Sequence, residues 1–154
     1  MIKFLGLSAA ICGSDLAIKS TVKEKVALNS RKDIVKDKVI LTKFYNKGAA
    51  LGFMSDHPEL LKGITIFSVG SLAGALSVVS GLKGHALQKV GFSMILGGAG
   101  SNAYERLRYG KVTDYIRLNM GSPKCRRVVY NLGDFAIFAG TALLLLGECF
   151  ELIK

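Results

Sequence analysis

The chain has 154 residues, half of them hydrophobic, and its mean hydropathy of +0.37 is too high for an ordinary soluble domain of this size. It carries 21 Lys and Arg against 11 Asp and Glu, which gives a formal net charge of +10. The basic residues lie in blocks between apolar segments and form no helix-turn-helix or aromatic-basic motif, so the charge indicates anionic lipid rather than nucleic acid. Cys12, Cys125 and Cys149 form no CxxC or Cys/His cluster, so we predict free thiols and no metal site.

Four segments approach the roughly 20 apolar residues that a membrane-spanning helix needs. They are residues 2–22, 64–82, 87–104 and 132–150. The first is the least apolar because Asp15 and Lys19 interrupt it. These two residues share a helix face, which lies either at a solvated helix end or toward the protein interior. The start of this segment, MIKFLGLSAAIC, also has features of a lipoprotein signal, but Ile11 stands where a small residue should precede the cysteine, so we expect a retained helix.

Small residues in the two middle segments predict close packing between helices, as is usual in lipid. These residues are Gly70, Gly74, Gly97 and Ser101. We therefore predict an all-α membrane protein, a bundle of four transmembrane helices that forms a single membrane-embedded domain over residues 1–154.

Two long connections separate the predicted spans. The first contains an alternating pattern around Val35, Val39 and Ile40 and then Phe44 and Tyr45, which predicts short strands and a small β-rich cradle in this loop. The second, which begins after the third span and ends before the fourth, contains seven basic residues. With four spans, both connections lie on the same side of the membrane. Their excess of Lys and Arg, taken alone, would place them in the cytoplasm.

Asp114 lies just beyond the third apolar segment, and Asp134 opens the fourth. A folded bundle can bring both carboxyl groups to the same membrane face. Two carboxylates held about 3 Å apart share one proton, so that one acts as a base toward water and the other as an acid. An acidic residue at a helix start is also a common cap, stabilised by the helix dipole. The spacing alone therefore leaves Asp134 open to either interpretation.

Five short motifs then occur in order along nearly the whole chain. Asp15 is followed four residues later by Lys19, and further on come NKGAAL, SNAYER, GKVTDY and NLGD. These motifs resemble those of the lipoprotein signal peptidases (signal peptidase II), a family of small four-span membrane aspartic proteases. The corresponding family motifs are Asn-x-Gly-Ala-Ala-Phe, Gly-Asn-x-x-Asp-Arg, Gly-x-Val-x-Asp-Phe and Asn-x-Ala-Asp.

The match is incomplete at several positions. Leu16 replaces a Gln that usually follows the early Asp, and Leu51 replaces an aromatic residue. Ser101 replaces Gly, Glu105 replaces Asp and Gly133 replaces Ala. These differences mark a divergent member of the family and leave room for altered substrate preference.

The resemblance implies a membrane aspartic endopeptidase that needs no cofactor and no metal. Its substrate would be a prolipoprotein that carries a diacylglyceryl group, and it would remove the signal peptide by cutting before the lipidated cysteine. Asp114 and Asp134 would activate a water and protonate the leaving amine. The resemblance places the substrate-binding and supporting positions at Asn46, Gly48, Asn102, Glu105, Arg106, Asn131, Asp15 and Lys19, with Asn46 and Arg106 against the substrate backbone and Asn102 and Asn131 orienting the aspartates.

The resemblance also implies a multi-pass protein of the bacterial plasma membrane with its site at the extracytoplasmic face. This orientation opposes the charge count, but the charge rule acts through short flanks more than through folded loops, and the basic loops can instead contact anionic lipid. We expect a monomer whose partners are diacylated prolipoproteins and membrane lipids. The alternative is an inactive or repurposed four-span scaffold or transport protein in which the aspartates pair with Arg106 or Arg108.

Overall fold

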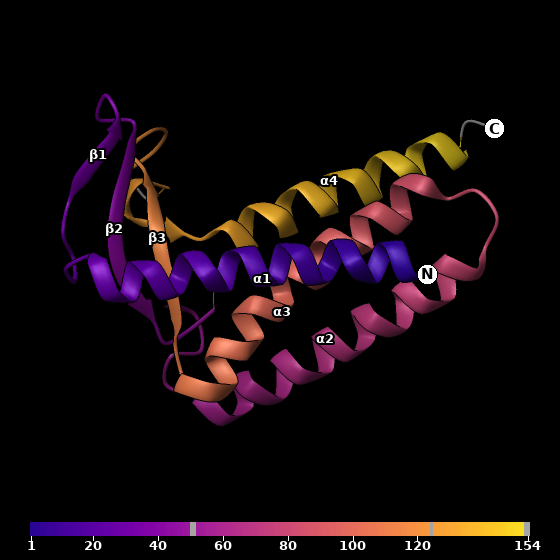
Figure 1. The fold of residues 1–154 in the computed structure, drawn as a ribbon, viewed down its shortest axis with the longest axis horizontal. Helices are drawn as coiled ribbons and strands as arrows, with labels where there is room; N and C mark the ends of the chain where they lie inside the picture. The colour runs from indigo at the N-terminus through magenta and orange to yellow at the C-terminus, as the bar shows by residue number, and fades with distance from the viewer. Residues whose placement is uncertain (50–51, 124, 153–154) are drawn as a thin grey trace.

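The structure, a computed structural model, describes residues 1–49, 52–123 and 125–152, so Ala50 and Leu51 of the NKGAAL motif lie outside the described residues. The elements occur in the order α1 (Ile2–Lys25), β1 (Lys32–Val35), β2 (Val39–Asn46), α2 (Pro58–Gly81), α3 (Ala86–Tyr109), β3 (Val112–Leu118), the 3-10 helix η2 (Cys125–Arg127), β4 (Val129–Tyr130) and α4 (Leu132–Leu152). The helices run lengthwise, with the small sheet at one end and both termini at the other (Figure 1). Both long connections therefore lie at the same end of the helices.

Each predicted span corresponds to a helix, and all four helices extend beyond their apolar segments, α2 and α3 the furthest. The helix α2 begins at Pro58 rather than residue 64, because proline at a helix start loses no hydrogen bond. The helix α3 continues to Tyr109, and Gly110 ends it in the left-handed conformation with φ of 67°. Glu105 and Arg106 consequently lie in the last turns of α3 and not in the connection where we expected them.

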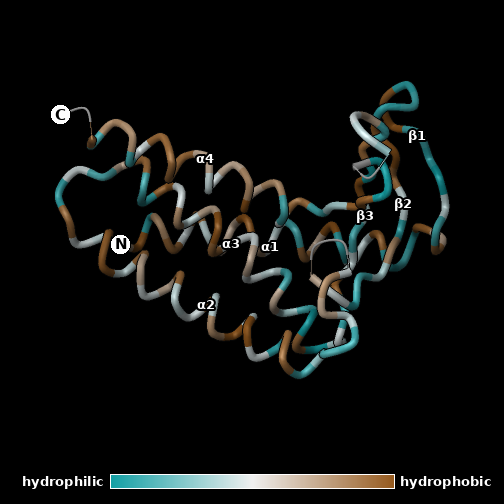
Figure 2. The backbone as a smooth tube through the Cα atoms, turned by 180° about the vertical axis from the view of Figure 1, so that it is seen from behind, coloured by the Kyte–Doolittle hydropathy of each residue, from teal (hydrophilic) through white to brown (hydrophobic). Residues whose placement is uncertain are grey.

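Two helices, α2 and α4, are long and apolar enough to cross a membrane by length and composition. The helices α1 and α3 are equally long, but each carries polar residues. Seven of these polar residues are buried: Ser8, Asp15 and Lys19 on α1, and Gln88, Ser93, Ser101 and Glu105 on α3. For Asp15 and Lys19, the interior placement is therefore the correct one. Hydrophobic residues follow most of α4, whereas hydrophilic ones gather around β1 and its turn (Figure 2).

The helix α3 packs against each of the other three helices. Against α4 the contact is made through glycines, because a Cβ added to Gly91 would lie 2.8 Å from the Gly140 carbonyl oxygen, and Gly98 is similarly close to Gly133. Gly97 contacts α1, where an added Cβ would lie 2.7 Å from the Ser8 carbonyl oxygen, as the prediction of close packing requires. The same prediction is wrong for Gly70 and Gly74. No atom of a neighbouring element lies within 4 Å of a Cβ added there, because both glycines lie on a face of α2 that touches no other helix.

The sheet is antiparallel with strand order β1-β2-β3-β4. The strands predicted in the first connection are present as β1 and β2. The cradle is not confined to that loop, because the second connection contributes β3 and β4. The pairing of β2 with β3 runs from Val39 opposite Leu118 to Asn46 opposite Val112. Two of the three predicted free thiols, Cys12 and Cys149, are free.

Candidate active site

Asp114 and Asp134 line one cavity at the place where the sheet meets the helices. Asp114 lies on β3, opposite Phe44 of β2, and Asp134 lies in the first turn of α4. The cavity, of about 260 Å³, is called the inner cavity below and is also lined by Asn46, Asn102, Arg106, Asn131 and Phe138. Folding thus gathers six of the predicted site residues around one space, although they come from both ends of the sequence.

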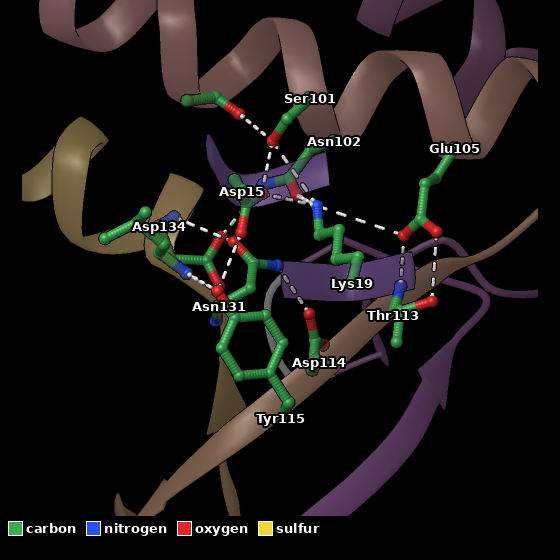
Figure 3. A network of polar contacts seen from close by, with 12 residues as sticks. Asp15, Lys19, Ser101, Asn102, Glu105, Thr113, Asp114, Tyr115, Asn131 and Asp134 are labelled. Carbon is green, nitrogen blue, oxygen red and sulfur yellow. Dashed lines mark hydrogen bonds and ion pairs between the residues drawn. The ribbon is translucent and has the colours of Figure 1, made fainter. Parts of the chain in front are cut away.

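Asn131 connects the two aspartates (Figure 3). Its side-chain Nδ2 donates to Asp114 Oδ1 at 2.7 Å, and its backbone N–H donates to Asp134 Oδ2 at 3.0 Å. In return, Asn131 Oδ1 accepts the backbone N–H of Asp134 at 2.9 Å, which completes a reciprocal cap at the start of α4. Asp134 is therefore a helix cap through one oxygen, while its Oδ1 accepts a hydrogen bond from Asn102 Nδ2 at 3.0 Å. The cap interpretation left open by the sequence is therefore confirmed, and Asp134 also lines the cavity that Asp114 lines.

The surroundings of the two carboxyl groups differ. Burial raises the pKa of Asp114 to about 7, the nearby charge of Asp134 acts in the same direction, and hydrogen bonds from Asn131 and Asn46 oppose the rise. Around Asp134, two N–H donors and the N-terminus of α4 stabilise negative charge. The inner cavity thus holds one carboxyl, Asp114, that keeps its proton up to about pH 7, and a second, Asp134, that accepts two N–H donors.

Arg106 and the loop after β2 close one side of the inner cavity. Arg106 Nη2 donates to the Gly48 carbonyl oxygen at 2.9 Å, and the Gly48 N–H donates to Asn46 Oδ1 at 3.0 Å. Position 48 needs glycine because an added Cβ would lie 2.5 Å from the carbonyl carbon of Gly52. Arg106 Nε is buried and has no hydrogen-bond partner in the described part of the chain.

Four charged residues form a second polar group beside the inner cavity, which we call the buried ion cluster: Asp15, Lys19, Lys23 and Glu105. The Lys19 ammonium lies 2.7 Å from Asp15 Oδ2, and both side chains are fully buried. Glu105 pairs with Lys23, lies 3.9 Å from Lys19, and accepts the Thr113 N–H at 2.6 Å. None of these four residues lines the inner cavity.

Two links join the buried ion cluster to the aspartates (Figure 3). In the first, Lys19 Nζ donates to Asn102 Oδ1 at 2.7 Å, and Asn102 in turn holds Asp134. In the second, the Tyr115 hydroxyl donates to Asp15 Oδ1 and accepts the N–H of Leu132, each at 2.9 Å. Burial raises the pKa of Tyr115, so this hydroxyl keeps its proton.

Sequence reasoning missed several residues of this network. Tyr115, the Ser101 hydroxyl, which donates to Asp15, and Thr113 and Lys23, which bind Glu105, were not predicted. The sequence contained one signal that could have indicated two of these residues. Tyr115 and Ser101 stand where the resembled motifs have Phe and Gly, so each adds a hydroxyl group to a position that lacks one in the family pattern.

The pairing expected for an inactive scaffold is not found. Among the residues that the structure describes, neither Asp114 nor Asp134 forms an ion pair, and Arg106 binds the Gly48 carbonyl instead. The aspartates are held by amide groups, which position them without neutralising their charge.

The fold is similar to that of two bacterial membrane enzymes solved by the in meso method. One aligns with a TM-score of 0.83 at 19% identity, over 98% of this chain and 90% of the other. The second aligns with a TM-score of 0.80 at 20% identity, over 96% of this chain and 93% of the other. At these identities the likeness concerns the fold.

Sequence comparison finds relatives of higher identity. A lipoprotein signal peptidase of Halothermothrix orenii is 31% identical over 132 residues, 86% of this chain and 85% of that protein. The lipoprotein signal peptidase of Sulfurihydrogenibium sp. is 27% identical over 154 residues, 97% of this chain and 93% of that protein. The family model described as Signal peptidase (SPase) II matches residues 7–150. Because this match includes all four helices, the sheet and both aspartates, the chain belongs to the signal peptidase II family.

Proposed function

We propose that the protein is a membrane aspartic endopeptidase that removes the signal peptide from diacylglyceryl-modified prolipoproteins, cutting before the lipidated cysteine. Similarity to proteins named lipoprotein signal peptidase supports the substrate class. The single observation that carries the chemistry is the joint placement of Asp114 and Asp134 in the inner cavity, bridged by Asn131 and without a cation partner among the described residues.

In the proposed mechanism, a water lies between the two aspartates. Asp134 accepts a proton from this water as its oxygen attacks the scissile carbonyl, and protonated Asp114 donates to the carbonyl oxygen. Collapse of the tetrahedral intermediate breaks the C–N bond, the proton held by Asp134 passes to the leaving amine, and a hydroxyl of the intermediate returns a proton to Asp114 as the carbonyl re-forms. Asn131 and Asn102 hold the carboxyl groups in place. Arg106, which lines the inner cavity, provides a guanidinium donor for the substrate backbone.

The proposal includes four spans in a single domain over residues 1–154. The helices have 24, 24, 24 and 21 residues, each long enough to cross a hydrocarbon core of about 30 Å. The low apolarity of α1 and α3 does not argue against this count, because Asp15 and Lys19 in the middle of α1, and Gln88, Ser93, Ser101 and Glu105 on α3, are buried rather than exposed to lipid. The inner cavity at the sheet end then lies at one membrane surface, where a lipid-bearing substrate can reach it.

We place the sheet end at the extracytoplasmic face. Single cysteines at Ser30, beside the sheet, and at Gly84, between α2 and α3, test this placement in a variant without the natural cysteines. A membrane-impermeant thiol reagent added to intact cells should label position 30 and spare position 84. Labelling of position 84 alone would reverse the orientation.

The activity is tested with purified protein and a diacylated precursor. Mass spectrometry should show a product that begins at the lipidated cysteine, and the same precursor without the lipid should remain uncut. Asp114→Asn and Asp134→Asn should each abolish the product. If both variants process the precursor at the rate of the unchanged protein, the aspartates have no catalytic role and the scaffold alternative is favoured.

A further inference from the structure

A second cavity, of about 470 Å³, adjoins the inner cavity and is called the outer cavity here. The two cavities share four lining residues: Asn46, Asp114, Val128 and Val129. Asp114 therefore faces both spaces. The pair forms one continuous cleft with a proposed catalytic residue near its middle.

The two halves of this cleft are built from different parts of the chain. Residues of α3 and α4 line the inner cavity, including Asn102, Arg106 and Phe138. No helix residue of the membrane bundle lines the outer cavity, which is formed by the end of β2, the loop that follows it and the segment from η2 to β4. Because the sheet lies at the end of the helices (Figure 1), the outer cavity, which is lined by the sheet and its loops, is the half that is not enclosed by the helices.

The outer cavity has an uncompensated positive charge. Lys47 and Arg127 line it, both side chains are exposed, and neither forms an ion pair within the described residues. Asp114 is its only acidic lining residue in the described part of the chain, and it is buried at the junction of the two cavities. A cleft lined by one sign of charge attracts a ligand of the opposite sign.

We propose that the outer cavity binds the first residues of the substrate on the carboxyl side of the scissile bond, and that Lys47 and Arg127 favour acidic side chains there. This proposal rests on the proposed function, because it requires a peptide bond held against Asp114. The apolar signal segment then occupies the half of the cleft near the helices, and the polar remainder leaves through the outer cavity. An extended segment advances about 3.3 Å per residue. We therefore expect the residues two to four positions beyond the lipidated cysteine to lie in the outer cavity that Lys47 and Arg127 line.

The test uses two diacylated precursors that differ only at positions two to four after the cysteine, with Asp and Glu in one and Lys in the other. The measured quantity is the ratio of kcat/KM for the acidic precursor to that for the basic one. The unchanged protein should prefer the acidic precursor by about five- to tenfold, as expected for two exposed ion pairs. Added salt should reduce this preference, because exposed charges are screened.

The decisive variant is the double charge reversal Lys47→Glu with Arg127→Glu, which should invert the ratio. A gain in kcat/KM for the basic precursor cannot result from misfolding. The matched control, Lys36→Glu with Lys83→Glu, changes the net charge equally at two exposed sites outside both cavities and should keep the original ratio. Equal ratios in the unchanged protein and the Lys47/Arg127 variant overturn this proposal alone. Failure of the unchanged protein to cut either precursor overturns the proposed function.

Discussion

Two pairs of acidic residues lie next to each other in this protein, and they differ in whether a cation neutralises their charge. Asp15 and Glu105 of the buried ion cluster are paired with Lys19 and Lys23. Asp114 and Asp134 have no cation partner in the described part of the chain and face a cavity. In the first pair, attraction compensates the burial of charge, so the groups can serve stability. In the second, the uncompensated burial keeps a proton on one carboxyl, which is the condition for acid–base chemistry.

The largest effect should come from removing one proposed catalytic carboxyl. Asp114→Asn keeps the shape of the side chain and the hydrogen bond from Asn131 but removes the proton donor, so precursor processing should fall about a thousandfold or more. The thermal unfolding temperature should stay the same or rise, because no ion pair is lost. Single-turnover processing and thermal unfolding in detergent measure the two quantities. If the variant loses both activity and stability, Asp114 also serves the stability of the fold, and the difference between the two pairs is contradicted.

The opposite behaviour is expected of the buried ion cluster. Lys19→Met removes the cation between Asp15 and Glu105 and leaves buried negative charge, so the free energy of unfolding should fall by about 3–5 kcal/mol. Lys3→Met, at an exposed position of the same helix, is the matched control and should change it by less than about 1 kcal/mol. Denaturation in detergent is the measurement. Similar values for the two variants would show that the cluster does not stabilise the fold.

Replacing Tyr115 tests whether its hydroxyl group couples the buried ion cluster to the helix that carries Asp134. Tyr115→Phe leaves Asp15 Oδ1 and the Leu132 N–H without this partner, so we expect a loss of about 1–3 kcal/mol in stability. It should also lower kcat more than it raises KM, because Leu132 begins the helix that carries Asp134. The control Tyr104→Phe removes a hydroxyl from a side chain that is 51% exposed and should have neither effect. If the two variants behave alike, the hydroxyl link has no role.

The smallest effect concerns pH. The pKa of Asp114 is raised from 3.8 to about 7, so this carboxyl is protonated below pH 7, and processing should decline about tenfold per pH unit above it. The folded state prefers the protonated form, so stability should also fall as the pH rises from about 4 to about 7. Asp114→Asn should lack this decline in stability. A pH–rate profile without a limb near pH 7 would contradict the assignment of Asp114 as the proton donor.

Much of this architecture follows from local sequence signals. The length of the apolar segments was enough to locate all four helices. The order of the motifs predicted that Asp114 and Asp134 lie at one site. The strand β3 (Val112–Leu118) was not predicted, because it lies in the connection that is rich in basic residues and because its stability comes from pairing with β2, which is distant in sequence. The hydroxyl links from Tyr115 were equally hidden, since their partners lie on α1 and α4.

Two departures from the family motifs are explained only by the packing of α3 on α4. A Cβ added to Gly133 would lie 2.9 Å from Ser101 Oγ and 2.8 Å from the Gly98 carbonyl oxygen. Ser101 replaces Gly, and Gly133 replaces Ala, so the hydroxyl of one residue fills space that the methyl group of the other would need. In the sequence, each substitution appears as an independent departure from the family motif. In the structure, the change in volume at one position compensates the change at the other.

The strand β4 ends at Tyr130 and α4 begins at Leu132, so Asn131 alone separates the part that carries Asp114 from the part that carries Asp134. A helix of 21 residues adjusts its tilt when the surrounding hydrocarbon becomes thicker or thinner. With so short a hinge, tilting of α4 alters the spacing of the acids directly. Reconstitution in bilayers of graded acyl-chain length should therefore give a turnover rate that peaks at one thickness, and a flat response would show that the hinge absorbs the movement.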